Sequence, residues 1–228
     1  MQRPDPDALR QALQSVTFFR GLDTPLLDVL ARAAVWRAYA AGAVVFLEGE
    51  AASGLYQVHT GWLKVLKLSV DGREQVLRLI GPGEVFNEIG VFASRPNPAT
   101  AITLEPTGIW LIEHRAVRQV LESHPSMAIQ VMERMADRIG DLVMLVTDLS
   151  LRTVEERLAR LLLQTQGDVL VRPPWATQAE LAARLGTVPD VLSRALRSLA
   201  DAGLIEVERQ QIRLLDRAGL EAKAMLTL

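Results

Sequence analysis

Residues 177–204 read TQAELAARLGTVPDVLSRALRSLADAGL, and this stretch predicts two short helices joined by a tight turn. Thr177 and Glu180 have the spacing of a capping box, in which two side chains satisfy free backbone amides at a helix start. Gly186 supplies the left-handed residue with which helices commonly end. Thr187 is expected to open the second helix, so the sequence predicts a helical hairpin with a sharply defined turn.

The second helix of this hairpin separates an apolar face from a polar one. Its apolar residues recur at helical spacing and are Val191, Leu192, Ala195, Leu196 and Leu199. Its outward polar residues are Asp190, Ser193, Arg194 and Arg197. The next residues, LIEVERQQIRLL at 204–215, hold two short apolar runs separated by polar residues, which indicates a β-hairpin. Two helices and a hairpin in this order predict a winged helix-turn-helix, whose second helix would enter a major groove of DNA.

Residues 177–215 resemble the DNA-binding domain of the Crp/Fnr family of bacterial transcription regulators, and the resemblance covers nearly the whole chain. Outside this stretch it is carried by LYQVHTGWLKVLKLSVDGREQVL at 55–77, GPGEVFNEIGVF at 81–92 and NPATAI at 97–102. The resemblance implies a transcription regulator that binds double-stranded DNA as a homodimer. It also implies RNA polymerase as a further partner.

The apolar residues of the N-terminal half recur with a different period. Residues 35–112 contain short runs rich in β-branched and aromatic residues, separated by Gly, Asp-Gly or Pro-Gly turns. This pattern predicts a β-roll or jelly roll, cupin-like, of about eight strands. The sequence therefore predicts a two-domain α+β protein. Residues 1–150 form the cyclic-nucleotide-binding-like sensor domain, which ends in a dimerisation helix at about 126–150, and residues 151–228 form the winged-helix domain.

The helix expected at 126–150 has apolar residues at alternating steps of four and three. This is the a/d pattern of a two-stranded coiled coil. The expected dimer seam consists of Met132, Met135, Ile139, Leu142, Val146 and Leu149. A long helix that packs only on its own β domain is the alternative.

Composition excludes several other classes of protein. No apolar run approaches the ~20 residues of a membrane span, and the N-terminus has no basic region followed by an apolar core, so a cytoplasmic protein without membrane contact is expected. The absence of cysteine excludes cysteine-ligated iron–sulfur clusters and disulfides. No Walker, Rossmann or nucleophile-elbow pattern occurs, so an enzyme is not expected. The net charge of −2 differs only slightly between the two predicted domains. Residues 151–228 hold 11 basic and 10 acidic side chains, and residues 1–150 hold the other 14 and 17.

In the Crp/Fnr family, the segment that here reads FNEIGVFASRPNPATA holds a cyclic nucleotide: backbone amides and an arginine bind the phosphate, and a glutamate binds the ribose. The resemblance therefore implies an effector pocket at this segment and on the long helix. Its residues are Asn87, Glu88, Ile89, Gly90, Pro98, Ala99, Leu142 and Val143.

This sequence departs from the family pattern at the positions that bind a nucleotide. Asn87 replaces a glycine, and Pro98 and Ala99 stand where the family has its phosphate-binding arginine and serine. Loss of that arginine removes a charge-assisted contact worth ~2 to 3 kcal/mol. Leu142 and Val143 have no hydroxyl groups for the adenine edge. Cyclic AMP binding of the usual kind is therefore not expected, and Arg95, three residues before Pro98, is the alternative cation for the phosphate.

The sequence therefore does not identify the effector. Haem remains open because one axial histidine is enough in some sites, and the histidines are His59, His114 and His124. They are scattered, and no cluster of histidine and carboxylate residues indicates a metal site. Two alternatives remain: a cyclic AMP- or haem-responsive regulator of the same architecture, and a dimeric interaction module that does not bind DNA.

The expected DNA contacts follow from side-chain chemistry. Arg194 is predicted to bind a guanine through two hydrogen bonds, and Asp190 to accept from a cytosine amino group. Ser193 is predicted to contact a neighbouring base or a phosphate. Arg197 and Thr177 are predicted to contact phosphates, which position the protein without specifying sequence. The D-x-x-S-R spacing of Asp190, Ser193 and Arg194 resembles that of the base-reading residues in the Fnr branch of the family more than that in the Crp branch.

Overall fold

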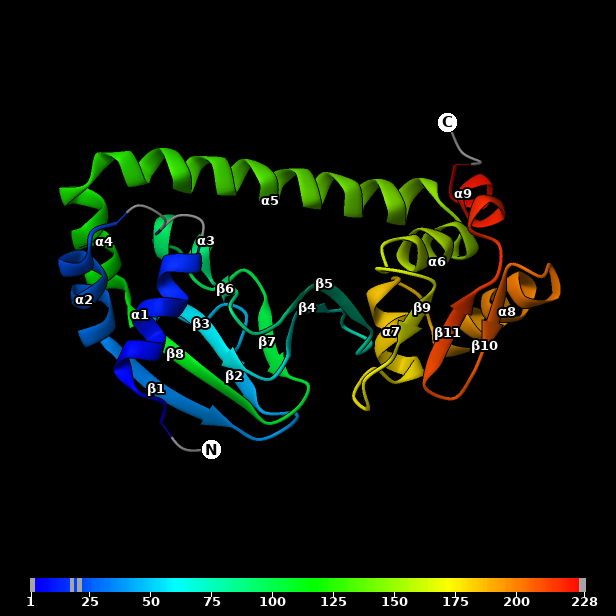
Figure 1. The fold of residues 1–228 in the computed structure, drawn as a ribbon, viewed down its shortest axis with the longest axis horizontal. Coiled ribbons are helices and arrows are strands. Elements are labelled where there is room, and N and C mark those ends of the chain that lie inside the picture. The colour runs from blue at the N-terminus through cyan, green and yellow to red at the C-terminus, as the bar shows by residue number, and fades with distance from the viewer. Residues whose placement is uncertain (1–2, 17–18, 20–21, 226–228) are drawn as a thin grey trace. The chain divides into compact units, whose positions relative to one another are not determined.

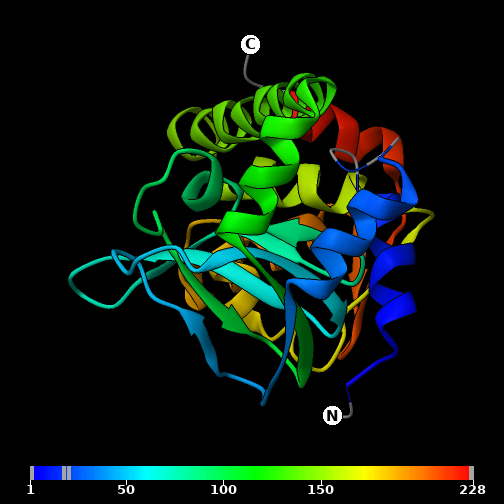
Figure 2. The same ribbon diagram turned by 90° about the vertical axis from the view of Figure 1, so that its left-hand side faces the viewer.

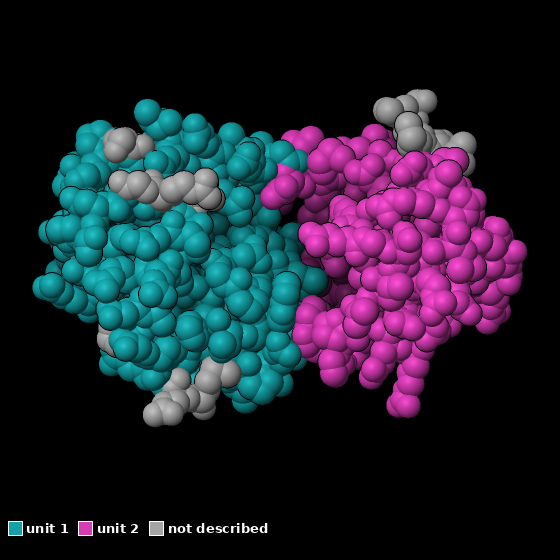
Figure 3. Space-filling view, viewed as in Figure 1, with its two compact units in different colours: residues 1–67, 77–140 teal, residues 68–76, 141–228 magenta. Residues whose placement is uncertain are grey.

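The computed structural model describes residues 3–16, 19 and 22–225. Its contacts divide the chain into two compact units (Figure 3), which are residues 1–67 with 77–140 and residues 68–76 with 141–228. The division falls within the long helix. The domain boundary expected near residue 150 stays a prediction.

The β-rich part of the chain has the architecture that the sequence predicts. Within the described residues, eight strands form two four-stranded sheets, with the orders β1-β8-β3-β6 and β2-β7-β4-β5 (Figure 1). The strands are β1 Ala34–Tyr39, β2 Val44–Phe46, β3 Gly54–Thr60, β4 Leu63–Leu68, β5 Glu74–Ile80, β6 Val85–Phe86, β7 Thr100–Thr103 and β8 Thr107–Glu113. The predicted Asp71-Gly72 turn joins β4 to β5, and Gly72 has a φ of 80°.

Aromatic side chains from both sheets form one core of the β-roll. Phe46 of β2 packs on Phe86 of β6, with ring centroids 5.9 Å apart, and Phe86 stacks on Tyr56 of β3 at 5.0 Å. Burial raises the pKa of the Tyr56 hydroxyl. Strand β3 is buried over five successive residues, because the other sheet covers one of its faces and helices cover the other.

Three helices cover the outer face of the sheet β1-β8-β3-β6 (Figure 2). They are α1 Pro6–Ser15, α2 Thr24–Arg32 and α4 His114–Ser123. Their leucines and valines form a second core with Trp110 and Ile112 of β8. These helices therefore complete the hydrophobic core of the β-roll.

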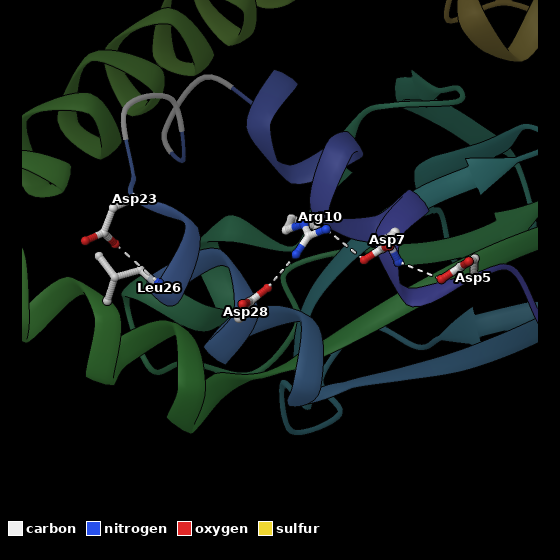
Figure 4. Close-up of polar contacts among 6 residues, drawn as sticks. All are labelled: Asp5, Asp7, Arg10, Asp23, Leu26 and Asp28. Atoms are coloured by element: carbon white, nitrogen blue, oxygen red, sulfur yellow. Dashed lines mark hydrogen bonds and ion pairs between the residues drawn. The ribbon is translucent and has the colours of Figure 1, made fainter.

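The starts of α1 and α2 are held by acidic caps (Figure 4). The Asp5 carboxylate accepts from the Asp7 amide at 3.0 Å, and the Asp23 carboxylate accepts from the Leu26 amide at 3.3 Å. Arg10 joins the two helices, since it pairs with Asp7 at 2.8 Å and with Asp28 of α2 at 3.2 Å.

The long helix α5 spans Pro125–Leu151. On one side Val131 is buried and Met135 packs against the core of the β-roll. On another side Met132, Ile139 and Val146 leave 62%, 63% and 60% of their surfaces exposed. The helix thus packs on its own domain and still presents apolar residues of the expected seam, whose role in a dimer stays a prediction.

The second unit contains the expected winged helix-turn-helix. Its elements are α6 Val154–Leu163, β9 Val169–Val171, α7 Gln178–Arg184, α8 Pro189–Asp201, β10 Ile205–Val207, β11 Gln211–Leu214 and α9 Arg217–Met225. The strands form an antiparallel sheet of order β10-β11-β9. Leu158, Leu181, Leu192, Leu199 and Ile212 belong to one core that joins the helices to this sheet.

Most of the features predicted for the turn between α7 and α8 are present in the structure. The Thr177 side chain accepts from the Glu180 amide at 3.2 Å, whereas the Thr177 amide donates to the Trp175 carbonyl at 2.8 Å, so the predicted capping box is seen in its Thr177 half. Gly186 is left-handed with a φ of 61°. The expected start of α8 is wrong, because the N-cap is Val188 and not Thr187. Pro189 forces the residue before it into an extended conformation and has no amide to cap.

Candidate DNA-reading surface and effector pocket

Helix α8 exposes the polar residues that the sequence singles out. Leu192, Ala195, Leu196 and Leu199 are buried in the core of the second unit. Asp190, Arg194 and Arg197 are consequently exposed on the opposite side of the helix.

These three charged side chains are not held by other groups. Within the part of the chain that the structure describes, none of Asp190, Arg194 and Arg197 forms a hydrogen bond or an ion pair. Arg194 lines an open hollow of about 580 Å³ with residues of α6 and α9. The guanidinium groups and the carboxylate therefore remain available to an external partner.

Ser193 and Thr177 are placed differently from the charged residues. The Ser193 hydroxyl donates to the Pro189 carbonyl at 2.8 Å and accepts from Nε2 of Gln178 at 2.7 Å. The Thr177 oxygen accepts from the backbone, which leaves its hydrogen available. Sequence reasoning did not single out Gln178, and the sequence signal that could have found it is its position directly after the cap of α7.

The end of α5 is joined to α6 and α7 by a group of charged residues in the second unit. The Asp148 carboxylate pairs with Arg152 at 2.9 Å and with Arg160 at 3.3 Å. Arg157 donates to the Leu185 carbonyl at the end of α7, at 2.5 Å. Burial lowers the pKa of Arg157, and the Asp148 carboxylate opposes this shift.

The expected effector pocket is a small cavity in the β-roll beside α3, Glu88–Phe92. Its volume is about 60 Å³. The predicted residues that line it are Asn87, Glu88, Ile89, Pro98 and Ala99. Arg78 of β5 and Arg138 of α5 also line it, and sequence reasoning missed both. Arg78 could have been found, because it occupies an inward position between Val76 and Ile80 on an alternating strand.

The other three predicted pocket residues lie elsewhere. A side chain at Gly90 would place its Cβ 2.7 Å from Cβ of Ala52, so this glycine allows close packing. Leu142 and Val143 follow Arg138 along α5 and belong to the second unit. Their part in an effector pocket stays a prediction.

Glu88 is held by a buried ion pair. Its carboxylate lies 3.3 Å from Arg78, which also pairs with Glu84 at 2.9 Å. The Arg78 and Glu88 side chains are only 11% and 9% exposed. Removal of one partner would leave the other charge buried and unpaired, which is strongly destabilising.

Asn87 keeps the backbone geometry of the glycine that it replaces. Its φ is 71°, in the left-handed region that asparagine tolerates better than most residues. Its Nδ2 donates to the Gly54 carbonyl at 3.0 Å. This departure from the family pattern is therefore compatible with the loop conformation.

The residues at the phosphate positions do not fit a cyclic nucleotide. Pro98 and Ala99 have no polar side chain, and Arg95 is exposed and lines no part of the cavity. Lys67 donates to the Pro98 carbonyl at 3.2 Å, but it is also paired with Glu48. The cavity is also far smaller than the ~300 Å³ of a typical small-ligand pocket.

None of the histidines considered as haem ligands lines this cavity. His59 packs edge-on against Trp36, with ring centroids 5.8 Å apart. His114 Nε2 lies 2.8 Å from the Val91 carbonyl, and His124 Nδ1 lies 3.0 Å from the Ser123 hydroxyl. Among residues 3–16, 19 and 22–225 there is no group of three or more metal-ligating side chains and no helix long and apolar enough to cross a membrane.

Comparison with known protein families supports both halves of this structure. Residues 36–124 match the model of the cyclic nucleotide-binding domain, and residues 156–223 match the Crp-like helix-turn-helix domain. The chain is 31% identical over 183 residues to the probable transcriptional regulator flp of Lacticaseibacillus casei, covering 78% of this chain and 82% of that protein. The chain belongs to the Crp/Fnr family of transcription regulators.

One further relative agrees with this assignment to the Crp/Fnr family, and one solved structure has the same fold. A CRP-like cAMP-activated global transcriptional regulator of Mycobacterium tuberculosis is 26% identical, over 94% of this chain and 99% of its own length. The structure of FixK2 from Bradyrhizobium japonicum has the same fold, with a TM-score of 0.72, 24% identity, and coverage of 82% of this chain and 96% of its own. The relatives from Lacticaseibacillus casei and Mycobacterium tuberculosis are named as transcription regulators and not as enzymes, and they do not support the alternative of a module that binds no DNA.

Proposed function

We propose that this Crp/Fnr regulator binds a palindromic DNA site as a homodimer, with one α8 in each of two successive major grooves. The observation that carries this proposal is the exposed side of α8, where Asp190, Arg194 and Arg197 are free of internal partners while the opposite side is anchored in the core. In helix-turn-helix dimers the two half-sites lie about 34 to 36 Å apart.

Each polar residue of this surface has a distinct role in the proposal. Arg194 donates two hydrogen bonds to a guanine, and Asp190 accepts from a cytosine amino group. Arg197 and the free hydrogen of Thr177 bind phosphates, which fix the position of the helix. The base contacts and the phosphate contacts thus both contribute to affinity, whereas sequence preference comes mainly from the base contacts.

The homodimer of the proposal forms along α5. Burial of the exposed Met132, Ile139 and Val146 against a second copy would remove apolar surface from water, at about 25 cal/mol per Å². The other three seam residues, Met135, Leu142 and Leu149, are half-buried within one chain. The seam therefore takes part in both the intramolecular and the intermolecular packing.

The proposed effector is a small molecule that binds at the β-roll. The proposed protein partner on DNA is RNA polymerase, and the proposed location is the cytoplasm. Cyclic AMP activates the relative from Mycobacterium tuberculosis, as its name states. Pro98 and Ala99 argue against the same ligand here, because their side chains cannot bind its phosphate. Calorimetry with cyclic AMP and an absorption spectrum for haem test the two named effectors directly.

Selection of bound fragments from a random DNA pool tests the proposed function. The expected product is a palindrome whose half-site centres are separated by about 10 to 10.5 base pairs. Enrichment of a single, unrepeated half-site would contradict the dimeric mode of binding. No enrichment, in the presence or absence of cell metabolites, would contradict DNA binding itself.

A further inference from the structure

The polar contacts of Ser193 link the two helices of the helix-turn-helix. Its hydroxyl oxygen lies 2.8 Å from the Pro189 carbonyl and 2.7 Å from Nε2 of Gln178. Gln178 is the first residue of α7, and its side chain is exposed. The contact therefore joins the start of α7 to the N-terminal half of α8, the half that reaches base edges in this type of domain.

These two contacts determine what the pair can offer to a base. A serine hydroxyl has one hydrogen and two lone pairs, and Ser193 donates its hydrogen to Pro189. The oxygen can then only accept from Gln178, so the amide group must turn its nitrogen towards Ser193. Gln178 keeps one N–H and its carbonyl oxygen Oε1, which have no hydrogen-bond partner among the described residues.

We propose that Gln178 and Ser193 act as one unit that reads an adenine, next to the guanine assigned to Arg194. The remaining N–H and Oε1 match the N7 acceptor and the N6 amino group of adenine, a pairing typical of glutamine. Gln178 is the specificity-determining residue, and Ser193 is a positioning residue that fixes the amide. This inference rests on the proposed function, because it requires α8 in a major groove.

A purely structural role for the pair predicts a different outcome. The junction of α7 and α8 is already buried by residues such as Leu181, Leu192 and Leu196. If the Gln178–Ser193 bond only strengthened this junction, its loss would weaken binding to every DNA sequence alike. A reading role predicts a loss confined to one base pair of each half-site.

The experiment uses the full-length dimer and the operator obtained by selection. Each base pair of one half-site is replaced in turn, and affinities are measured by fluorescence anisotropy at fixed salt. Gln178→Ala and Ser193→Ala should each reduce the preference for the same A·T pair by roughly five- to a hundredfold, the range for one bidentate base contact. The double variant should lose no more than either single variant.

Three further variants complete the design. Ser193→Thr keeps the hydroxyl and should restore the preference. Gln166→Ala and Ser198→Ala change the same residue types outside the proposed reading unit, and they should leave every preference unchanged. Circular dichroism of each variant establishes that the fold is retained.

Two outcomes would overturn the inference while the proposed function stands. Equal losses on operator and random DNA for Gln178→Ala would assign this residue to a structural role or to a phosphate contact, and not to the reading of a base. Additive losses at two different base pairs would mean that Ser193 reads its own base. If the wild-type protein selects no DNA at all, the proposed function fails, and the inference fails with it before any variant is compared.

Discussion

Substitution of Gly186 by alanine is expected to destabilise the second unit strongly. The φ of 61° at this position costs an L-residue about 1 to 2 kcal/mol. The added Cβ would also lie 2.3 Å from Cδ2 of Leu149 at the end of α5 and 2.5 Å from Oε1 of Gln75. Both atoms are the ends of side chains that can shift, so the overpacking cost falls at the low end of the usual ~1 to 3 kcal/mol. The two effects together predict a loss of about 2 to 3 kcal/mol.

Gly167 provides a matched control for this substitution. It is also left-handed, with a φ of 83°, but a Cβ there would meet no atom within 4 Å. Gly167→Ala should therefore show only the conformational cost of about 1 to 2 kcal/mol. Urea denaturation gives the stability of both variants, and hydrogen exchange of the α7 and α8 amides shows where the loss falls. Equal losses for the two variants would refute the packing of Leu149 and Gln75 on the turn.

Three more predictions concern the dimer and the β-roll. Ile139→Glu with Leu142→Glu should give monomers in sedimentation, because like charges would face each other across the seam; a surviving dimer would place the interface elsewhere. Arg78→Met should lower the free energy of unfolding by about 3 kcal/mol, since it leaves Glu88 buried and unpaired; an unchanged urea midpoint would contradict this role. Pro98→Arg with Ala99→Ser should raise the affinity for cyclic AMP at least tenfold in calorimetry, by restoring a charge-assisted contact worth ~2 to 3 kcal/mol; no gain would mean that the cavity itself excludes the nucleotide.

The helix-turn-helix could be predicted from the sequence because its signals are local. Thr177 caps α7, Gly186 ends it, and the apolar residues of α8 recur with the helical period. The start of α8 was misplaced by one residue because Thr187 has the composition of a cap, whereas Pro189 determines where the helix begins. Helix α9 was not predicted, since among its described side chains only Leu220 and Ala224 are buried, and no sustained apolar face marks it.

The effector cavity could be predicted only in part. The loop around Glu88 was found through its order in the chain and its resemblance to a known cassette. Arg78 and Arg138 come to this cavity from elements separated from the loop in sequence, and such contacts depend on tertiary packing. The departure at Asn87 changes the loop less than the sequence alone suggests, because asparagine adopts the left-handed conformation that the position requires.

The central claim is that α8 reads DNA sequence through Arg194. The most direct test compares the affinities of wild type, Arg194→Ala and Arg197→Ala for the selected operator and for random DNA over a range of salt concentrations. Arg194→Ala should lose roughly 1 to 3 kcal/mol on the operator and relax its preference at one guanine, whereas Arg197→Ala should weaken all sequences alike and lower the salt slope by about 1. Equal loss on operator and random DNA for Arg194→Ala would contradict the claim.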